Sequence, residues 1–573
     1  MVSSQIPDSE ALDVEALNTA GTPLPSLGRG AMLAVLAALG AHVLLVIAFS
    51  AGFRYQLNPD GISYLRIASY YARGDWTLAV SGYWGPLLSW LMAPFVPFIE
   101  EPAFIGRIGM GLSALVFWCG CVAVLYRLRT DARARLPRAG SAEVALGAWV
   151  AAVCGALWAV GEGGITPDLL MGGLLCLGIS GVLSDRWRHD RRAAFTAGLF
   201  LGLAYLARSP AFPLSVVIVP MLAALWAVTG LAPRALILKR LAVTALGFAL
   251  VSGPWIAVLS AKYGKPVFAT NAPIAHAVEG PSDQWRDHPS FRTFHRPESG
   301  RVTSWEDPTS LPYRYWSPVA NRRYAWHQAR LMYRNALDVL ERLGSFDWLH
   351  AGLFAAVFGF LIHRPWRKNL AAERWRWALI PVACVGGVYL PVHANEMRFY
   401  YVTLPFLFAA AAGLVYRLTR SETDGVNVPR GVGLLLVTVS FLGPPLHAIP
   451  IQFPAGDLGK GQVATAYDLA ARFKASGIRG SIAGNGPYAT GLYLAFFTDA
   501  PWYGDEPEAD AAQFEASGAD LALVDRRLPI ARQLDQRPDF EDLDPILFST
   551  REEAAASPAR VYRIRRAAAP AGP

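Results

Sequence analysis

Six ionisable residues lie where long apolar segments of this chain meet polar ones: Asp60, Glu162, Asp168, Arg208, Glu396 and Arg398. Ionisable groups at membrane depth are costly, and they usually mark functional sites. A carboxylate can accept a proton as a general base, and a guanidinium group can bind two phosphate oxygens at once. Acids and arginines that converge on one face are therefore suited to moving an anionic group.

Asp60 lies in the segment NPDGISYLRIASYYARG, shortly after a long apolar run. Asp is a favoured residue at a helix N-cap, and Gly74 is well placed to follow the C-terminus of the same helix. Small and apolar residues recur at helical spacing from Ile62 to Ala72. The pattern predicts a short helix on the outer membrane surface. Asp60 is then either the cap of this helix or a catalytic carboxylate held at the membrane surface.

Most of the other candidates also have a structural explanation. Arg208 could close a helical hairpin with its charge at the interface. Arg398 could simply pair with Glu396, and Asp168 could cap the apolar segment that begins after Pro167. Both interpretations of each residue stay open at this point.

Aromatic and polar neighbours accompany these groups. Tyr64, Tyr83 and Trp84 fit an interfacial aromatic belt, and they could equally stack on a sugar ring. His393 could be an interfacial histidine or a substrate contact, and Glu162 stands exposed among glycines.

The composition favours a membrane protein. Of 573 residues, 53% are hydrophobic and 17% charged, whereas soluble proteins carry about 25% charged residues. A helix of about 20 apolar residues can cross a bilayer. The sequence predicts eleven spans, at 31–51, 104–126, 142–161, 168–184, 193–207, 211–230, 241–259, 347–362, 377–392, 400–416 and 431–448. The stretch 86–98 is predicted to be a proline-interrupted helix at the interface.

Basic residues collect in short clusters between these spans, chiefly at 127–138, 185–192, 363–376 and 417–430. All the clusters fall on one side of an eleven-span arrangement, and such clusters mark the cytoplasmic side. The N-terminus is therefore predicted inside and the C-terminus outside. The formal net charge of +8 is distributed over these loops, and no basic stripe interleaved with aromatic residues indicates nucleic-acid binding.

The chain divides into three predicted parts: a disordered cytoplasmic tail (1–28), a transmembrane domain (29–450) with outer loops 52–103 and 260–346, and an outer domain (452–573). The last part alternates VATAYDLAARFKASG with SIAG, DLALVD and VYRIR, which predicts a small α/β domain. In the second outer loop, Glu306 and Asp307 of SWEDP are interpreted as opening a turn. All five cysteines lie in apolar runs, which excludes an outer disulfide framework and CxxC metal sites.

Five short motifs occur in a characteristic order: NPDG, PLLSWL, TPDLL, GLAYLAR and EMRFYYVTLP. Their order and sidedness resemble the C-type (GT-C) membrane glycosyltransferases, which use polyprenyl-phosphate sugars. Members that share this order of motifs are the aminoarabinose transferases of lipid A, the protein O-mannosyltransferases and the rhizobial lipopolysaccharide galacturonosyltransferases. The resemblance covers roughly residues 55–420. One position departs from it, because Gly61 follows Asp60 where the family usually has Glu.

The resemblance implies a polytopic α-helical membrane enzyme in the inner membrane of a bacterium. The enzyme would transfer a sugar from a polyprenyl phosphate to a hydroxyl of an envelope lipid, glycan or protein at the periplasmic face. It implies catalytic roles for Asp60, Asp168 and Glu162, and donor-phosphate binding by Arg208, Arg398 and Arg66. Substrate contacts are expected from Tyr64, Tyr83, Trp84, His393 and Glu396. Neither a metal nor a cofactor is expected.

Three other functions would suit a polytopic chain: an oligosaccharyltransferase, a transporter or flippase, and an inactive relative whose tail binds cell-wall glycan while the spans anchor it. An oligosaccharyltransferase is associated with a Trp-Trp-Asp motif, and no Trp-Trp pair occurs in this chain. A transporter or flippase of lipid-linked sugars is the alternative from another functional class. Transporters are typically built from internal repeats with charges near the membrane midplane. This sequence has no repeat at half length, and its acids lie at the ends of spans, so it favours the enzyme.

Overall fold

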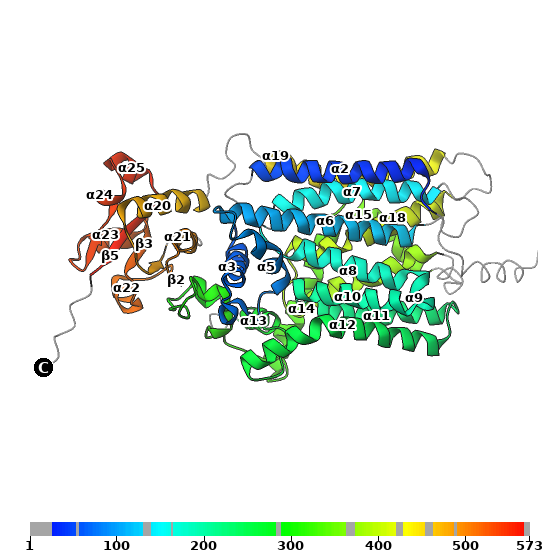
Figure 1. The fold of residues 1–573 in the computed structure, drawn as a ribbon, viewed down its shortest axis with the longest axis horizontal. Helices are drawn as coiled ribbons and strands as arrows, with labels where there is room; N and C mark the ends of the chain where they lie inside the picture. Colours follow the sequence, from blue (N-terminus) through cyan, green and yellow to red (C-terminus); the bar gives the residue numbers. More distant parts are fainter. Residues whose placement is uncertain are drawn as a thin grey trace, which may run out of the picture.

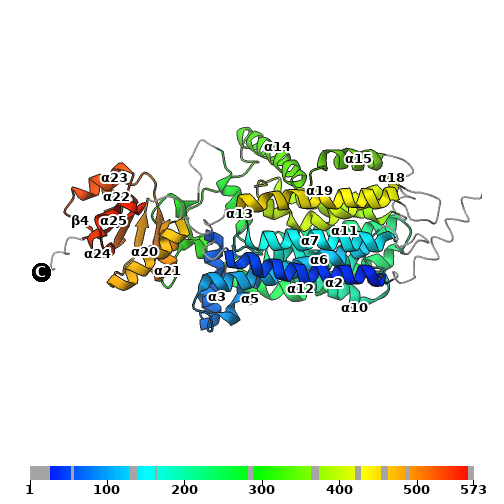
Figure 2. The same ribbon diagram turned by 90° about the horizontal axis from the view of Figure 1, so that it is seen from above.

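The computed structural model describes residues 26–52, 57–129, 139–161, 164–281, 288–362, 373–419, 428–452, 462–485 and 490–565. Within them, long helices lie side by side in a bundle, and a smaller α/β domain sits beyond one end of it (Figures 1 and 2). The end of the bundle next to that domain carries α3, α5 and α13 (Figure 1) and is called the α3 end below.

Each of the eleven predicted spans coincides with a helix of the described residues. These helices are α2 (Arg29–Gly52), α6 (Pro102–Leu128), α7 (Ala139–Val160), α8 (Asp168–Leu183), α10 (Arg191–Ala207), α11 (Ala211–Val228), α12 (Arg234–Tyr263), α15 (His350–Ile362), α17 (Leu379–Tyr389), α18 (Leu404–Leu418) and α19 (Val428–Gln452). The chain is a multi-pass membrane protein.

Not all eleven are long enough to cross a bilayer alone. Seven helical stretches of the described residues are long and apolar enough to cross it. They are α2, α6, α7, α11, α12, α19 and Met397–Leu418, which joins the turn η7 (Met397–Thr403) to α18. The others, α8, α10, α15 and α17, have 16, 17, 13 and 11 residues, fewer than the roughly 20 that a span requires. Eleven full spans are thus supported only in part.

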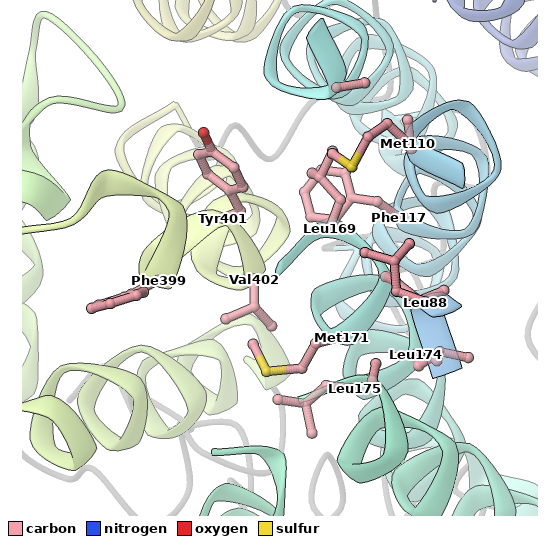
Figure 3. Close-up of a cluster of buried hydrophobic side chains, with 14 of the residues drawn as sticks. Leu88, Met110, Phe117, Leu169, Met171, Leu174, Leu175, Phe399, Tyr401 and Val402 are labelled. Carbon is pink, nitrogen blue, oxygen red and sulfur yellow. The ribbon is translucent and has the colours of Figure 1, made fainter. Parts of the chain in front are cut away.

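Glycines allow the central helices to approach closely. A Cβ at Gly120 of α6 would overlap the carbonyl of Gly173 of α8, and one at Gly198 of α10 would overlap the carbonyl of Thr244 of α12. Small residues are common at such contacts, because apolar burial gives no driving force for helix association inside lipid. Where α6 and α8 meet α5 and η7, apolar side chains such as Phe117, Leu169 and Val402 fill the space (Figure 3).

Short helices and turns cover the α3 end. In the first outer loop they are α3 (Pro59–Arg73), α4 (Trp76–Ala79), α5 (Pro86–Met92) and the turn η2 (Ala93–Phe95). The second outer loop contributes α13 (Asn271–Val278), η3 (Pro289–Phe291), η4 (Ser304–Glu306), η5 (Pro308–Ser310) and α14 (Arg322–Gly344). The predicted helix after Asp60 and the broken helix at 86–98 are both present.

The described parts of the basic clusters at 185–192, 363–376 and 417–430 lie at the opposite end, near α9 (Asp185–His189) and the turn η6 (Arg374–Ala378). Arg374 Nη2 lies 2.9 Å from Asp185 Oδ1, and Arg417 Nη1 lies 3.1 Å from Glu373 Oε1. These ion pairs join three of the predicted basic clusters at one end of the bundle. The acids and arginines of the candidate site therefore lie at the end away from them.

The C-terminal domain contains a five-stranded sheet with the order β2-β1-β3-β5-β4. The parallel strands are β1 (Ile482–Gly484), β2 (Trp502–Asp505) and β3 (Leu521–Asp525). Strand β5 (Ala559–Ile564) pairs antiparallel with β3 on one side and with β4 (Phe540–Asp542) on the other. The helices are α20 (Gln462–Ser476), α21 (Thr490–Thr498), α22 (Ala511–Ser517), α23 (Pro529–Asp535), α24 (Asp544–Leu547) and α25 (Arg551–Ala556). The sheet has the α/β character that the alternating sequence predicts.

Candidate active site

Asn58, rather than Asp60, caps α3. Asn58 Oδ1 accepts hydrogen bonds from the backbone N–H groups of Gly61, at 3.2 Å, and of Ile165, at 3.0 Å. The helix ends at Gly74, whose φ of 81° lies in the left-handed region. The interpretation of Gly74 is confirmed, and the interpretation of Asp60 as the cap is wrong. Its carboxylate makes a long-range contact instead.

That contact is with Arg398 of η7. Arg398 Nη1 donates to Asp60 Oδ2 at 2.9 Å, although the residues are 338 positions apart. Arg398 Nε also lies 3.4 Å from Glu396 Oε2. The side chains of Asp60 and Arg398 are 22% and 17% exposed, respectively, so a ligand could reach both. Glu396 is more exposed and lies at the rim.

A second carboxylate–guanidinium pair joins Asp168 to Arg208. Asp168 is the first residue of α8, and Arg208 follows the last residue of α10. Arg208 Nη1 donates to Asp168 Oδ1. Asp168 is fully buried, whereas the Arg208 side chain is 19% exposed. The geometry suits Asp168 to holding Arg208 in place rather than to touching a substrate.

Phe399 brings the two pairs together. The guanidinium carbon of Arg208 lies 4.7 Å from the centre of its ring, and that of Arg398 lies 5.8 Å from it. Tyr389 stacks on the same ring with a centroid distance of 4.6 Å. The Phe399 side chain points away from the apolar cluster of α6 and α8 (Figure 3). Both cations are thus held around one aromatic ring, where cation–π attraction favours them.

Aromatic residues line the same region. Tyr64 lies one helical turn after Asp60, and its ring contacts Trp84 at 5.2 Å between centroids; Tyr83 contacts Trp84 at 4.5 Å. Trp84 Nε1 donates to the carbonyl of Trp305 at 2.8 Å. Burial raises the pKa of both Tyr64 and Tyr83 above the usual tyrosine value. Both phenols therefore stay protonated and can donate hydrogen bonds.

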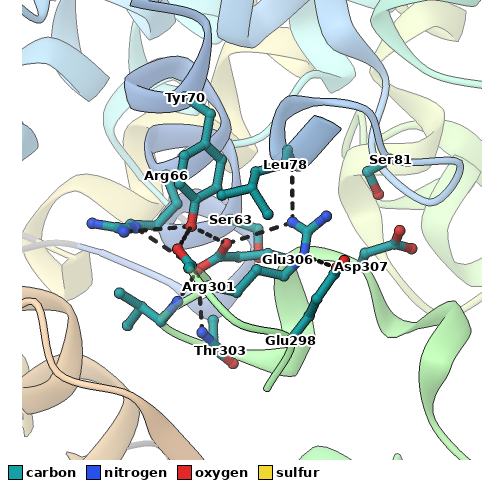
Figure 4. Close-up of polar contacts among 12 residues, drawn as sticks. Ser63, Arg66, Tyr70, Leu78, Ser81, Glu298, Arg301, Thr303, Glu306 and Asp307 are labelled. Carbon is teal, nitrogen blue, oxygen red and sulfur yellow. Dashed lines mark hydrogen bonds and ion pairs between the residues drawn. The ribbon is translucent and has the colours of Figure 1, made fainter. Parts of the chain in front are cut away.

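Two predicted site residues, Arg66 and His393, stand apart from this group. Arg66 Nη1 donates to Asp499 Oδ1 at 2.7 Å, within a separate set of polar contacts (Figure 4). The reason is helical periodicity, because Asp60 and Tyr64 share one face of α3 and Arg66 lies on another. His393 Nδ1 lies 3.1 Å from Glu279 Oε1. Glu162 falls outside the described residues.

Two members of the site were not predicted. Phe399 directly follows Arg398, but its ring gave no chemical signal in the sequence. Tyr389 belongs to an apolar run and is recognisable only from the stacking. Among the described residues, no group of three or more His, Cys, Asp or Glu side chains is arranged to hold a metal ion.

No protein-family model and no curated protein matches this chain. Among solved structures, ArnT from Cupriavidus metallidurans bound to undecaprenyl phosphate aligns with a TM-score of 0.51 and 14% identity, over 95% of this chain and 99% of its own. The same ArnT in its apo state aligns with a TM-score of 0.50 and 14% identity, over 92% and 98% of the two chains. The chain has the GT-C fold.

The GT-C fold agrees with the resemblance seen in the five sequence motifs. Arabinofuranosyltransferase AftD from Mycobacteria aligns less well, with a TM-score of 0.42, 13% identity and coverage of 95% of this chain and 42% of its own, and adds nothing to the fold assignment. At such identities the likeness establishes the fold, and the activity has to be argued from the site.

Proposed function

We propose that this chain is a glycosyltransferase that moves a sugar from a polyprenyl-phosphate donor to an acceptor hydroxyl at the periplasmic face of a bacterial inner membrane. The observation that carries the proposal is the convergence of two acids and two arginines, from four elements of a GT-C fold, around Phe399. The undecaprenyl phosphate bound to ArnT supports the same chemical class for the donor lipid.

Arg208 and Arg398 would bind the donor phosphate. A guanidinium group has five N–H donors in a planar fork, and each arginine uses one terminal nitrogen on its carboxylate partner. Each arginine is neutralised by its carboxylate but keeps unused N–H donors. A phosphate is negatively charged, so it would attract these remaining donors and accept hydrogen bonds from them. Buried Asp168 would keep Arg208 aimed while the phosphate binds.

Asp60 would act as the general base. The acceptor oxygen attacks the anomeric carbon of the sugar, the bond from that carbon to the phosphate oxygen breaks, and the acceptor proton passes to Asp60. Asp60 lies in the first turn of α3, and its carboxylate faces Arg398 Nη1 at 2.9 Å. The phosphate leaves with its growing charge stabilised by the arginines. A single displacement of this kind inverts the anomeric configuration.

The remaining polar groups would contact the substrates. Tyr64 and Tyr83 can donate hydrogen bonds to sugar hydroxyls, and exposed Glu396 at the rim can face the acceptor. We assign catalysis to residues 29–450 and a periplasmic location to the domain at 452–573. The basic loops at the opposite end support a cytoplasmic location for that end.

Replacing Asp60 by Asn tests the proposal. Loss of a general base typically lowers a rate by about 10²–10⁴-fold, so a deletion strain complemented with Asp60→Asn should lack the envelope product in mass spectrometry of its lipids and glycans. Asp75→Asn is the matched control, because Asp75 lies just after α3 and forms only an exposed contact with Arg73. Product at the wild-type level from a folded Asp60→Asn protein would overturn the proposal.

A further inference from the structure

A second charged cluster lies where α3, the second outer loop and the α/β domain meet. We call it the junction cluster; Figure 4 shows Arg66, Tyr70, Arg301 and Glu306, and Asp499 completes it. Arg66 Nη1 bonds Asp499 at 2.7 Å, and its Nε lies 3.7 Å from Glu306 Oε1. The cluster therefore links three segments that are distant in sequence.

Glu306 is the fixed centre of this cluster. Its side chain is fully buried, and it accepts hydrogen bonds from the Tyr70 hydroxyl at 2.6 Å and from the backbone N–H groups of Val302 and Thr303 at 3.0 and 3.2 Å. Arg301 Nη1 lies 3.6 Å away on the other side. A buried acid with this many partners specifies one arrangement, so it anchors α3 to the loop. The turn predicted at SWEDP is present, and Glu306 does more than open it.

One helix of the α/β domain touches α3 at two points. The hydroxyl of Tyr493, in α21, donates to the carbonyl of Leu57 at 3.2 Å. Leu57 immediately precedes the cap Asn58. Asp499, which follows the last residue of α21, bonds Arg66 near the middle of α3. Helix α21 thus holds both the start of α3, next to Asp60, and its central turns.

The backbone of Asp499 is strained. Its φ of 53° makes it the one residue other than glycine with positive φ in the described part of the chain. Its side chain is 73% exposed, whereas that of its partner Arg66 is 10% exposed. The positive φ closes the C-terminus of α21, where the Ala500 N–H donates to the Ala495 carbonyl at 2.9 Å. Glycine is the usual residue at such a position, and Asp499 instead brings a carboxylate to Arg66.

The second outer loop also extends the sheet of the α/β domain. Strand β2 lies at the edge of the sheet, and its Trp502 N–H donates to the carbonyl of Val302 at 2.6 Å. The carbonyl of Tyr503 accepts a hydrogen bond from the N–H of His295 at 2.5 Å. Backbone hydrogen bonds at a free sheet edge fix the register of the added segment. The domain, the loop and α3 therefore form one interlocked unit.

We infer that the α/β domain positions the catalytic carboxylate: through Tyr493 and Asp499, α21 holds α3 in the place that brings Asp60 to Arg398. Tyr493 and Asp499 are positioning residues, since neither touches the reacting groups. The role of these two contacts in catalysis rests on the proposed function, whereas the contacts themselves are seen in the structure.

The test uses two double variants of the full chain in lipid nanodiscs. The test protein carries Tyr493→Phe and Asp499→Asn, and the control protein carries Tyr562→Phe and Asp468→Asn. The control residues lie in the same domain, where Tyr562 bonds the Ala531 carbonyl and Asp468 pairs with Arg472. Hydrogen exchange of the α3 amides should rise about tenfold in the first protein only. Affinity for undecaprenyl phosphate should stay within about twofold, while envelope product in a complemented deletion strain falls about tenfold.

A further variant, Asp499→Gly, separates the carboxylate from the strain. Glycine adopts positive φ without cost, so the unfolding temperature of Asp499→Gly should be no lower than that of the wild type. Its α3 hydrogen exchange should nevertheless rise, because the carboxylate that bonds Arg66 is absent. Unchanged α3 exchange in the test protein, or an equal rise in the control, would overturn the inference. Absence of envelope product from wild-type cells would overturn the proposed function alone, because exchange is measured independently of transfer.

Discussion

At the scale of single residues, the candidate site depends on the shape of the guanidinium groups as well as on their charge. Arg398 contacts Asp60 and Glu396 from different nitrogens of one planar group. A lysine ammonium is a compact point charge, so it cannot hold a carboxylate and a phosphate in a fixed relation. Arginine identity therefore matters at this position.

Arg398→Lys is expected to bind undecaprenyl phosphate roughly tenfold more weakly than the wild type, because bidentate phosphate contact is lost. Binding can be measured by microscale thermophoresis of the detergent-purified proteins. Arg73→Lys is the control, since Arg73 is about half exposed, pairs with Asp75 and lies over the ring of Tyr70, away from Arg398. Equal affinity of Arg398→Lys and wild type would argue against phosphate binding by Arg398.

A second residue-scale prediction concerns acid stability. Burial alone would raise the pKa of Glu279, but His393 and Arg334 outweigh it and lower the pKa below its usual value. A carboxyl with a lowered folded-state pKa stabilises the fold above its unfolded pKa of about 4.3, and this stability is lost as the pH falls through the folded value. The unfolding temperature of wild type should therefore fall more steeply below about pH 4.3 than that of Glu279→Gln. Parallel curves for the two proteins would contradict this.

At the scale of elements, α3 matters most, because it carries Asp60 and Tyr64 on one face and Arg66 on another. Its start is fixed by Asn58, whose one oxygen serves both the first turn of α3 and the segment before α8. The cap thus joins the element of Asp60 to the element of Asp168.

Asn58→Ala should destabilise the start of α3 by about 1–2 kcal/mol, the usual effect of losing a cap, whereas Asn58→Asp keeps an acceptor oxygen and should lose less. Hydrogen exchange of the α3 amides measures the difference. Asn321→Ala is the matched control, because Asn321 caps α14 in the same way, through the Tyr324 N–H at 2.8 Å. An effect of Asn321→Ala on α3 equal to that of Asn58→Ala would contradict the assignment.

At the scale of the whole molecule, the site is built from the bundle and the first outer loop, while the second outer loop and the α/β domain hold α3 beside it. A ligand that bridges Arg208 and Arg398 would bind only the folded arrangement, and ligands of this kind stabilise the native state. The protein as a whole should therefore report donor binding through its thermal stability.

Undecaprenyl phosphate at one hundred times its dissociation constant should stabilise the wild-type protein by about 2.7 kcal/mol. Arg208→Ala/Arg398→Ala should show little of this effect, because both proposed phosphate ligands are absent. Differential scanning fluorimetry in detergent measures the shift, and undecaprenol, which lacks the phosphate, is the ligand control. An equal shift with undecaprenol would indicate that the lipid tail alone binds.

The sequence by itself determined the elements and the end of the molecule at which the candidate site lies. The apolar runs predicted a helix at each of eleven positions, and the basic clusters predicted the end of the bundle where α9 and η6 form their ion pair. The helix after Asp60, its end at Gly74 and the α/β character of the C-terminal domain were predictable for the same reason. These features depend on local composition and periodicity, which neighbouring residues in the sequence determine.

Only the tertiary structure decided which charged side chains pair with one another. Asp60 bonds Arg398 rather than capping α3, Asp168 bonds Arg208, and Arg66 turns away to Asp499. A side chain's partner is set by contacts hundreds of residues apart, and each such contact depends on how several helices pack at once. Local sequence patterns therefore do not predict how these helices pack.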